Sequence, residues 1–339
     1  MNDNYALPRG SKILVTGANG YIASHVVDQL LALGYTVRGT IRSPKPWLNE
    51  YFNEKYGSNS FETFIMSSFG DKTTVKRALD GTDGVIHLAS DLSFGSNPEE
   101  VIPWVVQATL NLLEISSQVS TIKRVVLASS SSATYSLSPE PNGRQLHVDT
   151  WNDDSVKAAW NDSTPKEKKG VAVYAASKTE GERQSWRWME EHRPQFEFNT
   201  VLPCFVVGKI LHPEIPGSTM GWVRKLLEGD DTALSQFPEQ WYVDVEDTAR
   251  LCVLGLLDRT VTSERIFAFG EQTNWTDTIS MLRQLRPNNN SIPSPPENEV
   301  RDQTEVIPRA RAEDLLRAFY GVSGFTSVKE SLAKGIDGR

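Results

Sequence analysis

A tyrosine and a lysine four residues apart, Tyr174 and Lys178, are the side chains whose spacing most clearly suggests chemistry. In a helix, residues at i and i+4 lie on one face, so the phenol and the ammonium are expected to be close together. A phenol has an ordinary pKa near ~10 and is a poor acid at neutral pH. A nearby ammonium favours the phenolate and moves the phenol pKa toward the working range. The pair is therefore suited to proton exchange with a substrate oxygen.

A run of four serines, Ser129–Ser132, follows the apolar segment 124–128. A carbonyl that accepts a hydride needs a hydrogen-bond donor aimed at its developing negative charge, and the end of a neighbouring strand can supply one. We expect one of these hydroxyls to fill that place. A Tyr-x-x-x-Lys spacing alone is common by chance, so its weight comes from the features that accompany it.

A glycine-containing turn, TGANGYIA at residues 16–23, joins a predicted strand to a predicted helix. Gly17 permits the tight turn, and Gly20 allows the backbone to approach a pyrophosphate at the helix N-terminus. Ala23 supplies the third small residue, where the helix must pack closely on the strand. This context predicts a dinucleotide site, and we expect its contacts to include Thr16, Gly17, Asn19, Gly20, Tyr21 and Ile22.

The second predicted strand indicates which dinucleotide binds. NAD-binding versions of this unit usually place an Asp or Glu at the end of that strand, where it holds the ribose hydroxyls. Here the segment TVRGTIRS at 36–43 has no acid and carries Arg38 and Arg42 instead. A guanidinium can bind a 2′-phosphate with two hydrogen bonds, whereas a carboxylate would repel it. We therefore expect NADP (as NADPH) in preference to NAD.

Short apolar runs alternate with longer helical patterns, and these elements must position the residues above. With little polar alternation, the runs predict strands that are covered on both faces. The predicted strands are 13–16, 36–41, 61–66, 84–89, 124–129, 198–202 and 265–269, and the predicted helices are 21–33, 73–80, 99–119, 174–193, 247–258 and 310–320. This alternation predicts an α/β fold of the Rossmann type, with a doubly wound parallel sheet of about seven strands.

The regular alternation weakens after about residue 203, where prolines, glycines and aromatic residues mix. We expect residues 1–203, together with about 243–270, to form an NADP-binding Rossmann domain. Residues 204–242 and 271–339 are then expected to form a smaller, mostly α substrate-binding region. Within it, residues 287–299 have the polar, proline-rich composition of a surface loop.

Composition narrows the class of protein. A net charge of −8 argues against a nucleic-acid partner, and 39% hydrophobic with 23% charged residues is typical of a soluble globular chain. The N-terminal residues lack a secretory pattern, and the longest nearly apolar stretch, 101–113, is too short to span a bilayer. The two cysteines, Cys204 and Cys252, are expected to be free thiols. We therefore expect a cytoplasmic protein without a membrane partner.

The order of the motifs resembles the extended short-chain dehydrogenase/reductase superfamily. The motifs that carry this resemblance are TGANGYIASH (16–25), LASS (127–130), YAASK (174–178) and PCFVVG (203–208). A finer resemblance is to fungal NADPH-dependent aldehyde/carbonyl reductases, near the plant dihydroflavonol reductases. Its segments are VRGTIRS (37–43), HLAS (87–90), YAASKTE (174–180), GSTMGW (217–222) and PEQWYVDVEDTA (238–249). The resemblance covers nearly the whole chain and is looser beyond about residue 280.

The resemblance implies roles for individual residues. The catalytic serine, tyrosine and lysine of the family fall on Ser130, Tyr174 and Lys178, and Ser131 competes with Ser130 if the register slips by one residue. The arginine for the 2′-phosphate falls on Arg42, with Arg38 beside it. Where many relatives have an Asp that meets the adenine, this chain has Ser68. Further cofactor contacts are expected at Leu88, Ala89, Ser90, Lys178, Pro203, which closes the nicotinamide site, and Val206.

The substrate is expected outside the carboxyl ends of the strands, near the nicotinamide. The side chains that we expect to reach it, besides Ser130 and Tyr174, are Leu92, Phe94, Cys204, Phe205, Trp222, Phe237, Gln240, Trp241 and Tyr242. Phe237 and Gln240 are preferred because the matching segment contacts substrate in the resembling reductases. The aromatic set favours an apolar or aromatic ketone or aldehyde as the small-molecule partner. The five histidines show no metal-ligand spacing, so no metal is expected.

Two alternatives remain open from the sequence. A sugar-nucleotide epimerase or dehydratase shares this fold and tyrosine. Dehydratases of that group usually carry an acidic pair soon after the serine, whereas Ser131, Ser132 and Ala133 follow Ser130 here. A non-catalytic NADP-binding regulator is the second alternative, but such proteins often lose the tyrosine or the lysine. Relatives occur as monomers and dimers, so a homodimer is one expected state.

Overall fold

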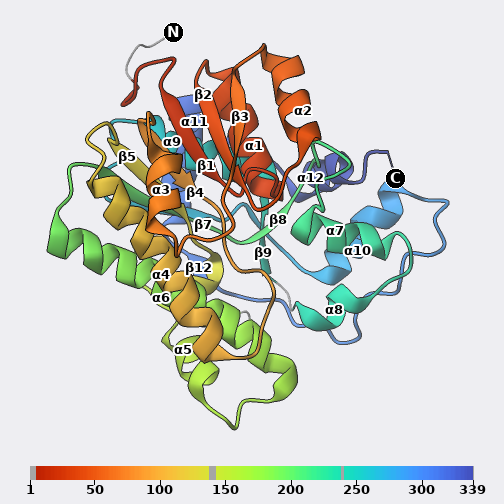
Figure 1. The fold of residues 1–339 in the computed structure, drawn as a ribbon. Helices are drawn as coiled ribbons and strands as arrows, with labels where there is room; N and C mark the ends of the chain where they lie inside the picture. The colour runs from red at the N-terminus through yellow and green to blue at the C-terminus, as the bar shows by residue number, and fades with distance from the viewer. Residues whose placement is uncertain (1–4, 137–142, 238–239, 339) are drawn as a thin grey trace.

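A seven-stranded parallel sheet forms the centre of the computed structural model, which describes residues 5–136, 143–237 and 240–338 (Figure 1). The strand order is β10-β7-β5-β4-β1-β2-β3. The bounds are Lys12–Thr16 (β1), Thr36–Ile41 (β2), Phe61–Ile65 (β3), Gly84–His87 (β4), Arg124–Ala128 (β5), Glu197–Pro203 (β7) and Arg265–Ala268 (β10). All seven strands predicted from the apolar runs are present, so the predicted Rossmann-type fold is confirmed.

Helices cover both faces of this sheet. Leu14 of β1 packs in one apolar cluster with residues of α3, α4 and α6, whereas Ile13 and Val15 belong to a larger cluster that includes α1, α2, α9 and α11. This alternation along β1 reflects the strand period of two. The helix bounds are Tyr21–Ala32 (α1), Pro46–Tyr56 (α2), Lys72–Leu79 (α3), Pro98–Ser117 (α4), Asp153–Trp160 (α5), Lys166–His192 (α6), Val245–Leu257 (α9) and Arg309–Tyr320 (α11).

Helix α6 differs from its predicted bounds, because it begins at Lys166 instead of near Tyr174. Its first five residues read KEKKG, and this charged segment has no apolar face for a sequence pattern to detect. Tyr174 and Lys178 therefore lie in the interior of a 27-residue helix. Helices α2 and α5 were not predicted, since each buries only two residues.

The later part of the chain adds two small sheets to its helices. One has three strands in the order β11-β9-β8, and the other pairs β12 with β6 in parallel. The bounds are Gln145–Leu146 (β6), Phe205–Val207 (β8), Gln240–Asp244 (β9), Glu271–Thr273 (β11), Glu305–Val306 (β12), Ser218–Leu226 (α7), Thr232–Gln236 (α8), Trp275–Leu285 (α10) and Val328–Gly335 (α12). Strands of two to five residues leave almost no periodic signal, which is why the sequence indicated a mostly helical region.

Cys204 and Cys252 are both buried and free, as expected. Within the described residues, no helix combines the length and apolar character that crossing a bilayer requires. The same residues contain no group of three or more His, Cys, Asp or Glu side chains arranged to hold a metal ion.

Candidate active site

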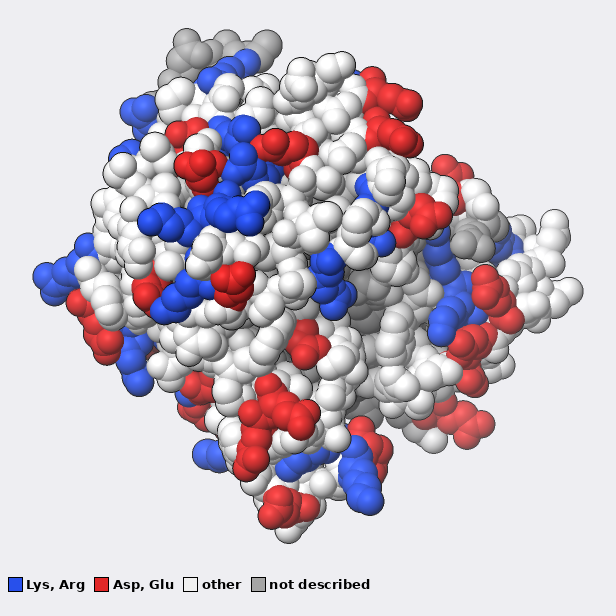
Figure 2. Space-filling model, in the orientation of Figure 1, with Lys and Arg blue, Asp and Glu red and all other residues white. Residues whose placement is uncertain are grey.

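The predicted catalytic and nucleotide-binding residues meet at the carboxyl ends of β1, β4 and β5. Between β1 and β4 the chain changes direction across the sheet, because β2 and β3 extend it on one side and β5, β7 and β10 on the other. In open α/β sheets, ligands bind at such a switch point. Figure 2 shows a hollow on this side of the molecule, with acidic and basic side chains interspersed over the surrounding surface.

The glycine turn is closely packed. Gly17 has φ 68°, a left-handed conformation that favours glycine, and a Cβ at Gly20 would lie 3.0 Å from the carbonyl oxygen of Gly17. Gly39 of β2 is a further requirement that the sequence argument missed, since a Cβ there would lie 2.5 Å from Cβ of Ala18. Helix α1 follows with no acidic residue in its first turn and no side-chain cap. Its first amides therefore suit an anionic group.

Thr16 ties the turn to the end of β4. Its Oγ1 accepts hydrogen bonds from the amides of Leu88 and Ala89, both at 2.9 Å, and lies 2.8 Å from Nδ1 of His87. Burial, together with the charge of Lys178, lowers the pKa of His87 to about 3, so the imidazole is neutral. Tyr21 is also buried and donates its hydroxyl to the carbonyl of Gly208 at 2.9 Å. The hydrogen bonds of the Thr16 and Tyr21 side chains thus fix the position of the glycine turn. Asn19 lies half-buried in that turn, and Ile22 lies half-buried in the first turn of α1.

The two arginines of the second strand have different surroundings. Arg38 donates to Glu62 at 2.9 Å and to the carbonyls of Ala78 and Asp80, at 3.0 and 2.7 Å. Arg42 is exposed and has no hydrogen bond or ion pair with any other described residue. Arg38 is thus held by protein partners, and the cofactor contact expected of it stays a prediction. Arg42 is the arginine that is available to a 2′-phosphate.

Ser130 meets Tyr174 at the end of β5. Ser130 precedes a short 3-10 turn, and its Oγ accepts hydrogen bonds from the amide and hydroxyl of Ser132, at 3.2 and 2.9 Å. Because Ser130 Oγ is the acceptor in both of these bonds, its hydroxyl proton is available for a third hydrogen bond. Burial raises the pKa of Tyr174, and a hydrogen bond with Ser130 opposes that rise. Of the two serines considered, the structure brings Ser130 to the phenol, whereas Ser131 uses its carbonyl to accept from Thr134.

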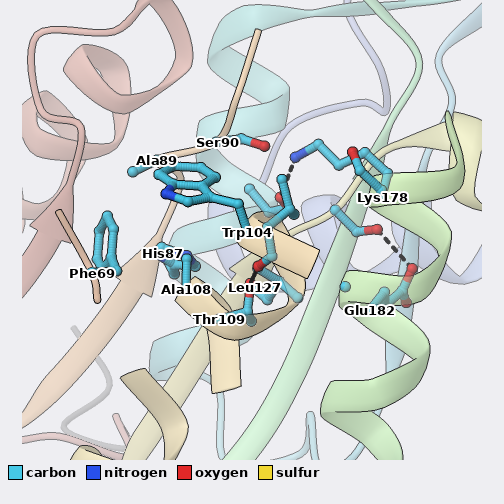
Figure 3. Close-up of a pocket in the computed structure, with 15 residues that line it drawn as sticks. Phe69, His87, Ala89, Ser90, Trp104, Ala108, Thr109, Leu127, Lys178 and Glu182 are labelled. Carbon is cyan, nitrogen blue, oxygen red and sulfur yellow. Dashed lines mark hydrogen bonds between the residues drawn. The ribbon is translucent and has the colours of Figure 1, made fainter. Parts of the chain in front are cut away.

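Lys178 lies one turn after Tyr174, with Nζ 3.4 Å from the carbonyl oxygen of Ala128, to which it donates (Figure 3). Burial lowers the pKa of Lys178 to about 8, and the negative charge of Glu182 opposes that shift. The lysine lines a cavity of about 20 Å³, room for about one water molecule. Ser90 lines the same cavity, and its buried Oγ has no partner among the described residues.

Glu182, a residue that the sequence argument missed, lies next along the same face of α6. Its carboxylate is buried and accepts from Arg265 at 2.8 Å, from Ser129 at 2.7 Å and from Thr200 at 2.7 Å. Its position at i+4 from Lys178 continues the spacing of the Tyr174–Lys178 pair. This repeated spacing of four residues was the feature of the sequence that could have indicated Glu182.

Aromatic rings gather beside the phenol of Tyr174. The ring of Phe94 lies 4.9 Å from that of Tyr174 and 6.4 Å from that of Phe237, measured between centroids. Phe237 in turn lies 4.4 Å from Trp222 and 6.0 Å from Phe205. Trp275, which was not predicted, donates its indole N–H to the carbonyl of Phe237 at 2.6 Å. Four predicted aromatic side chains thus form a chain of ring contacts, which reaches Tyr174 through Phe94.

The other predicted substrate contacts differ in their hydrogen-bond partners and in their exposure to solvent. Trp241 donates to the carbonyl of Thr304 at 3.1 Å, and Tyr242 to that of Ser327 at 3.2 Å, so both are used in packing. Burial raises the pKa of the Cys204 thiol, which is therefore not an activated nucleophile. Leu92 is 58% exposed. The side chain of Gln240, with residues 238–239, lies outside the described part of the chain.

Three further residues that were predicted to contact the cofactor are Ser68, Pro203 and Val206. Ser68 lies half-buried in the loop after β3, and its Oγ accepts from the amide of Gly70 at 3.0 Å. Pro203 ends β7, where it pairs with Ala268. Val206 is buried in β8. Pro203 thus lies at the carboxyl end of a central strand, and Ser68 and Val206 follow the carboxyl ends of β3 and β7.

Comparison with known proteins shows likeness over the whole chain. Residues 13–270 match the NAD dependent epimerase/dehydratase family. The ketoreductase nvfG of Aspergillus novofumigatus is 44% identical over 98% of this chain and 97% of its own length. Aldehyde reductase 2 of Sporidiobolus salmonicolor is 35% identical over 97% and 96% of the two chains. A solved structure of yeast methylglyoxal/isovaleraldehyde reductase Gre2 with NADPH superposes with a TM-score of 0.78, at 22% identity and 96% coverage of each chain.

Proposed function

The chain belongs to the NAD dependent epimerase/dehydratase family, and on that premise we propose that it is an oxidoreductase that reduces a carbonyl group with NADPH. The membership confirms the resemblance drawn from the motifs. Relatives that are 44% and 35% identical are named a ketoreductase and an aldehyde reductase. The observation that carries the proposal is the meeting of Ser130 with Tyr174, one helical turn from Lys178, in a fold whose glycine turn leads into the uncapped N-terminus of α1.

The residues present fit NADPH. Gly17 and Gly20 leave room for a pyrophosphate against the uncapped N-terminus of α1. Arg42 is a cation without a protein partner among the described residues, at the end of the strand that contacts the ribose in this fold. A guanidinium there favours the additional phosphate of NADP.

The side chains of this chain supply positioning and a proton. When bound, NADPH supplies the hydride that reduces the carbonyl carbon. Ser130 donates its hydroxyl proton in a hydrogen bond to the substrate oxygen, because Ser132 already donates to Ser130 Oγ. Tyr174 protonates that oxygen as its negative charge develops. The ammonium of Lys178 stabilises the phenolate that remains on Tyr174.

The substrate that this site suits is apolar or aromatic. Phe94, Trp222 and Phe237 lie in contact beside Tyr174, and such rings bind an apolar group by burial and by edge or offset stacking. We assign the substrate side of the protein to residues 204–242 and 271–339, with residues 1–203 and about 243–270 on the cofactor side.

The test is NADPH consumption against aryl ketones, β-keto esters and aldehydes, with NADH in parallel. The Tyr174→Phe variant is the control, because it removes the proton donor and keeps the ring. We expect turnover that is selective for NADPH and is lost in the variant, while the variant still binds NADPH. Tight NADPH binding without turnover of any carbonyl would contradict the proposal and direct the next assays to nucleotide sugars.

A further inference from the structure

One face of helix α6 packs along the end of β5. Three successive residues of the β5 end each contact one of three residues spaced by four on α6. Ser130 bonds to Tyr174. The Ala128 carbonyl accepts from Lys178, and Ser129 Oγ donates to Glu182 (Figure 3). Tyr174 and Lys178 have roles in the proposed reaction, whereas Glu182 has none so far.

We propose that Glu182 is a positioning residue for this reaction, whose fixed negative charge, one helical turn beyond Lys178, holds the Lys178 ammonium directed at the end of β5. The proposal rests on the function proposed above. Glu182 does not reach the reacting atoms, so its effect passes through Lys178.

Both oxygens of the Glu182 carboxylate accept hydrogen bonds from neighbouring side chains. Arg265 donates to both oxygens, at 2.8 and 3.3 Å, while Ser129 and Thr200 each donate at 2.7 Å. Arg265 is itself fixed, with its guanidinium 3.9 Å from the centroid of the Trp151 ring. Hydrogen bonds from this many donors hold the buried carboxylate in one orientation. The carboxylate that Lys178 meets is therefore in one place.

The negative charge of Glu182 matters because burial disfavours the ammonium form of Lys178. Burial lowers its pKa to about 8, and Glu182 is the group whose charge raises it. Glu182 is the one carboxylate among the residues that line the cavity beside Lys178. Among the described residues that line this cavity, the other titratable group is His87 from β4, which is neutral. The residues of α4 that line the cavity, Trp104, Val105, Ala108 and Thr109, carry no charge.

The first test is Glu182→Gln, which keeps the size of the side chain and removes its charge. That variant leaves Arg265 buried without a counter-ion, a change that can prevent folding. The double variant Glu182→Gln/Arg265→Gln removes both charges together and avoids this. Glu182→Asp keeps the charge, and Thr200→Val deletes one hydrogen bond to Glu182 without changing any charge.

The measurement is the pH dependence of kcat/KM for carbonyl reduction, with thermal unfolding to establish that each variant is folded. We expect the basic limb of the profile to move down by about one pH unit in the double variant, and in the single variant where it folds. Glu182→Asp and Thr200→Val should keep the limb of the natural enzyme. A folded double variant with an unmoved limb would overturn the proposal, since a merely structural Glu182 changes stability and not this pKa.

A second readout separates this inference from the proposed function. The pKa of the Lys178 ammonium is measured without substrate by NMR of ¹⁵N-labelled lysine, with the signal assigned through Lys178→Arg. The Lys178 pKa should be lower in the double variant than in the natural protein, whether or not any carbonyl is reduced. If the natural protein reduces no carbonyl but this shift is present, the proposed function fails and the charge effect stands. If carbonyls are reduced and the shift is absent, only the role of Glu182 fails.

Discussion

The ring of Phe94 lies against the ring of Tyr174, with the centroids 4.9 Å apart and the planes inclined at 39°. Phe94 has φ 53°, which is uncommon for a bulky residue, so the loop after β4 holds it there against a backbone preference. Gly170, four residues before Tyr174 on α6, permits the contact. A Cβ at Gly170 would lie 2.5 Å from the carbonyl oxygen of Phe94.

Substitution of Gly170 by Ala should therefore lower activity, although Gly170 itself does not contact Tyr174. The added methyl group must displace the backbone of Phe94, and the ring would then lose its contact with Tyr174. Since an aromatic pair contributes about 0.5–1.5 kcal/mol, we expect kcat/KM for an aryl ketone to fall by roughly 2- to 10-fold. Steady-state kinetics with an aryl ketone and a small aliphatic aldehyde measures this, and the aldehyde should be affected less.

Gly181→Ala is the matched control for Gly170→Ala. It lies on the same helix, but its Cβ would lie 3.4 Å from the Val105 side chain, an ordinary contact. We expect near-normal kinetics from this variant, because alanine also favours the helix. Equal losses in the two variants would mean that any added methyl group on α6 disturbs the enzyme and that Phe94 is not the cause.

The neighbouring serines allow a second prediction. Ser130 is bonded to Tyr174, whereas Ser131 is buried and is not among the groups that act on the phenol. Ser130→Ala should lower kcat by about 100-fold or more, since it removes a donor to the developing oxyanion. Ser131→Ala should retain most of the activity. Kinetics of the two variants with one ketone decides between them, and a greater loss in Ser131→Ala would reverse the assignment.

A third prediction concerns pH. The pKa of Lys178 is lowered to about 8 from an ordinary value of 10.5, chiefly by burial. Above pH 8 the free enzyme loses the ammonium, so kcat/KM for reduction should fall, by about tenfold per pH unit. Stability should respond in the opposite sense. Between pH 8 and 10.5 the unfolded chain binds more protons at this lysine than the folded chain does, so this residue's contribution to stability increases with pH.

The two effects are measured together by kinetics and by thermal unfolding over pH 6.5–9.5, a range of roughly the width needed to follow one titration. Activity should fall above pH 8 while the melting temperature shows no loss from Lys178. A fall of both at the same pH would mean that unfolding limits the activity. Lys178→Met should remove the basic limb along with most of the activity.

The sequence indicated the central sheet well because its strands are buried on both faces. A segment such as Arg124–Ala128, buried at every residue, leaves a continuous apolar run. The small sheets left no such run, since their pairing depends on contacts between distant segments. Gln145–Leu146 pairs with Glu305–Val306, which is 160 residues away in the chain, and two residues carry no periodicity.

The elements that carry the candidate site were indicated where a motif has a local spacing. The Tyr174–Lys178 pair and the Gly17–Gly20 turn each lie within five residues, and they lie on the predicted helix and in the predicted strand-to-helix turn. Arg265 could not be predicted, because it meets Glu182 from a different strand, 83 residues away. The protein partners of Arg38 were not indicated for the same reason. Only the folded chain shows that the carbonyls at the end of α3 occupy its guanidinium.

The contrast between the two arginines gives the last prediction. Arg42 is exposed and has no partner among the described residues, whereas Arg38 is held by Glu62 and the end of α3. Arg42→Asp should move the preference from NADPH toward NADH, because the carboxylate repels the 2′-phosphate and can accept from the ribose hydroxyls. A charge-assisted hydrogen bond contributes about 1.5–3 kcal/mol, so we expect the ratio of kcat/KM values to change by about tenfold or more. Arg38→Ala should lower the melting temperature and leave that ratio nearly unchanged. A change of ratio in Arg38→Ala but not in Arg42→Asp would show that Arg38 leaves its protein partners to bind the phosphate.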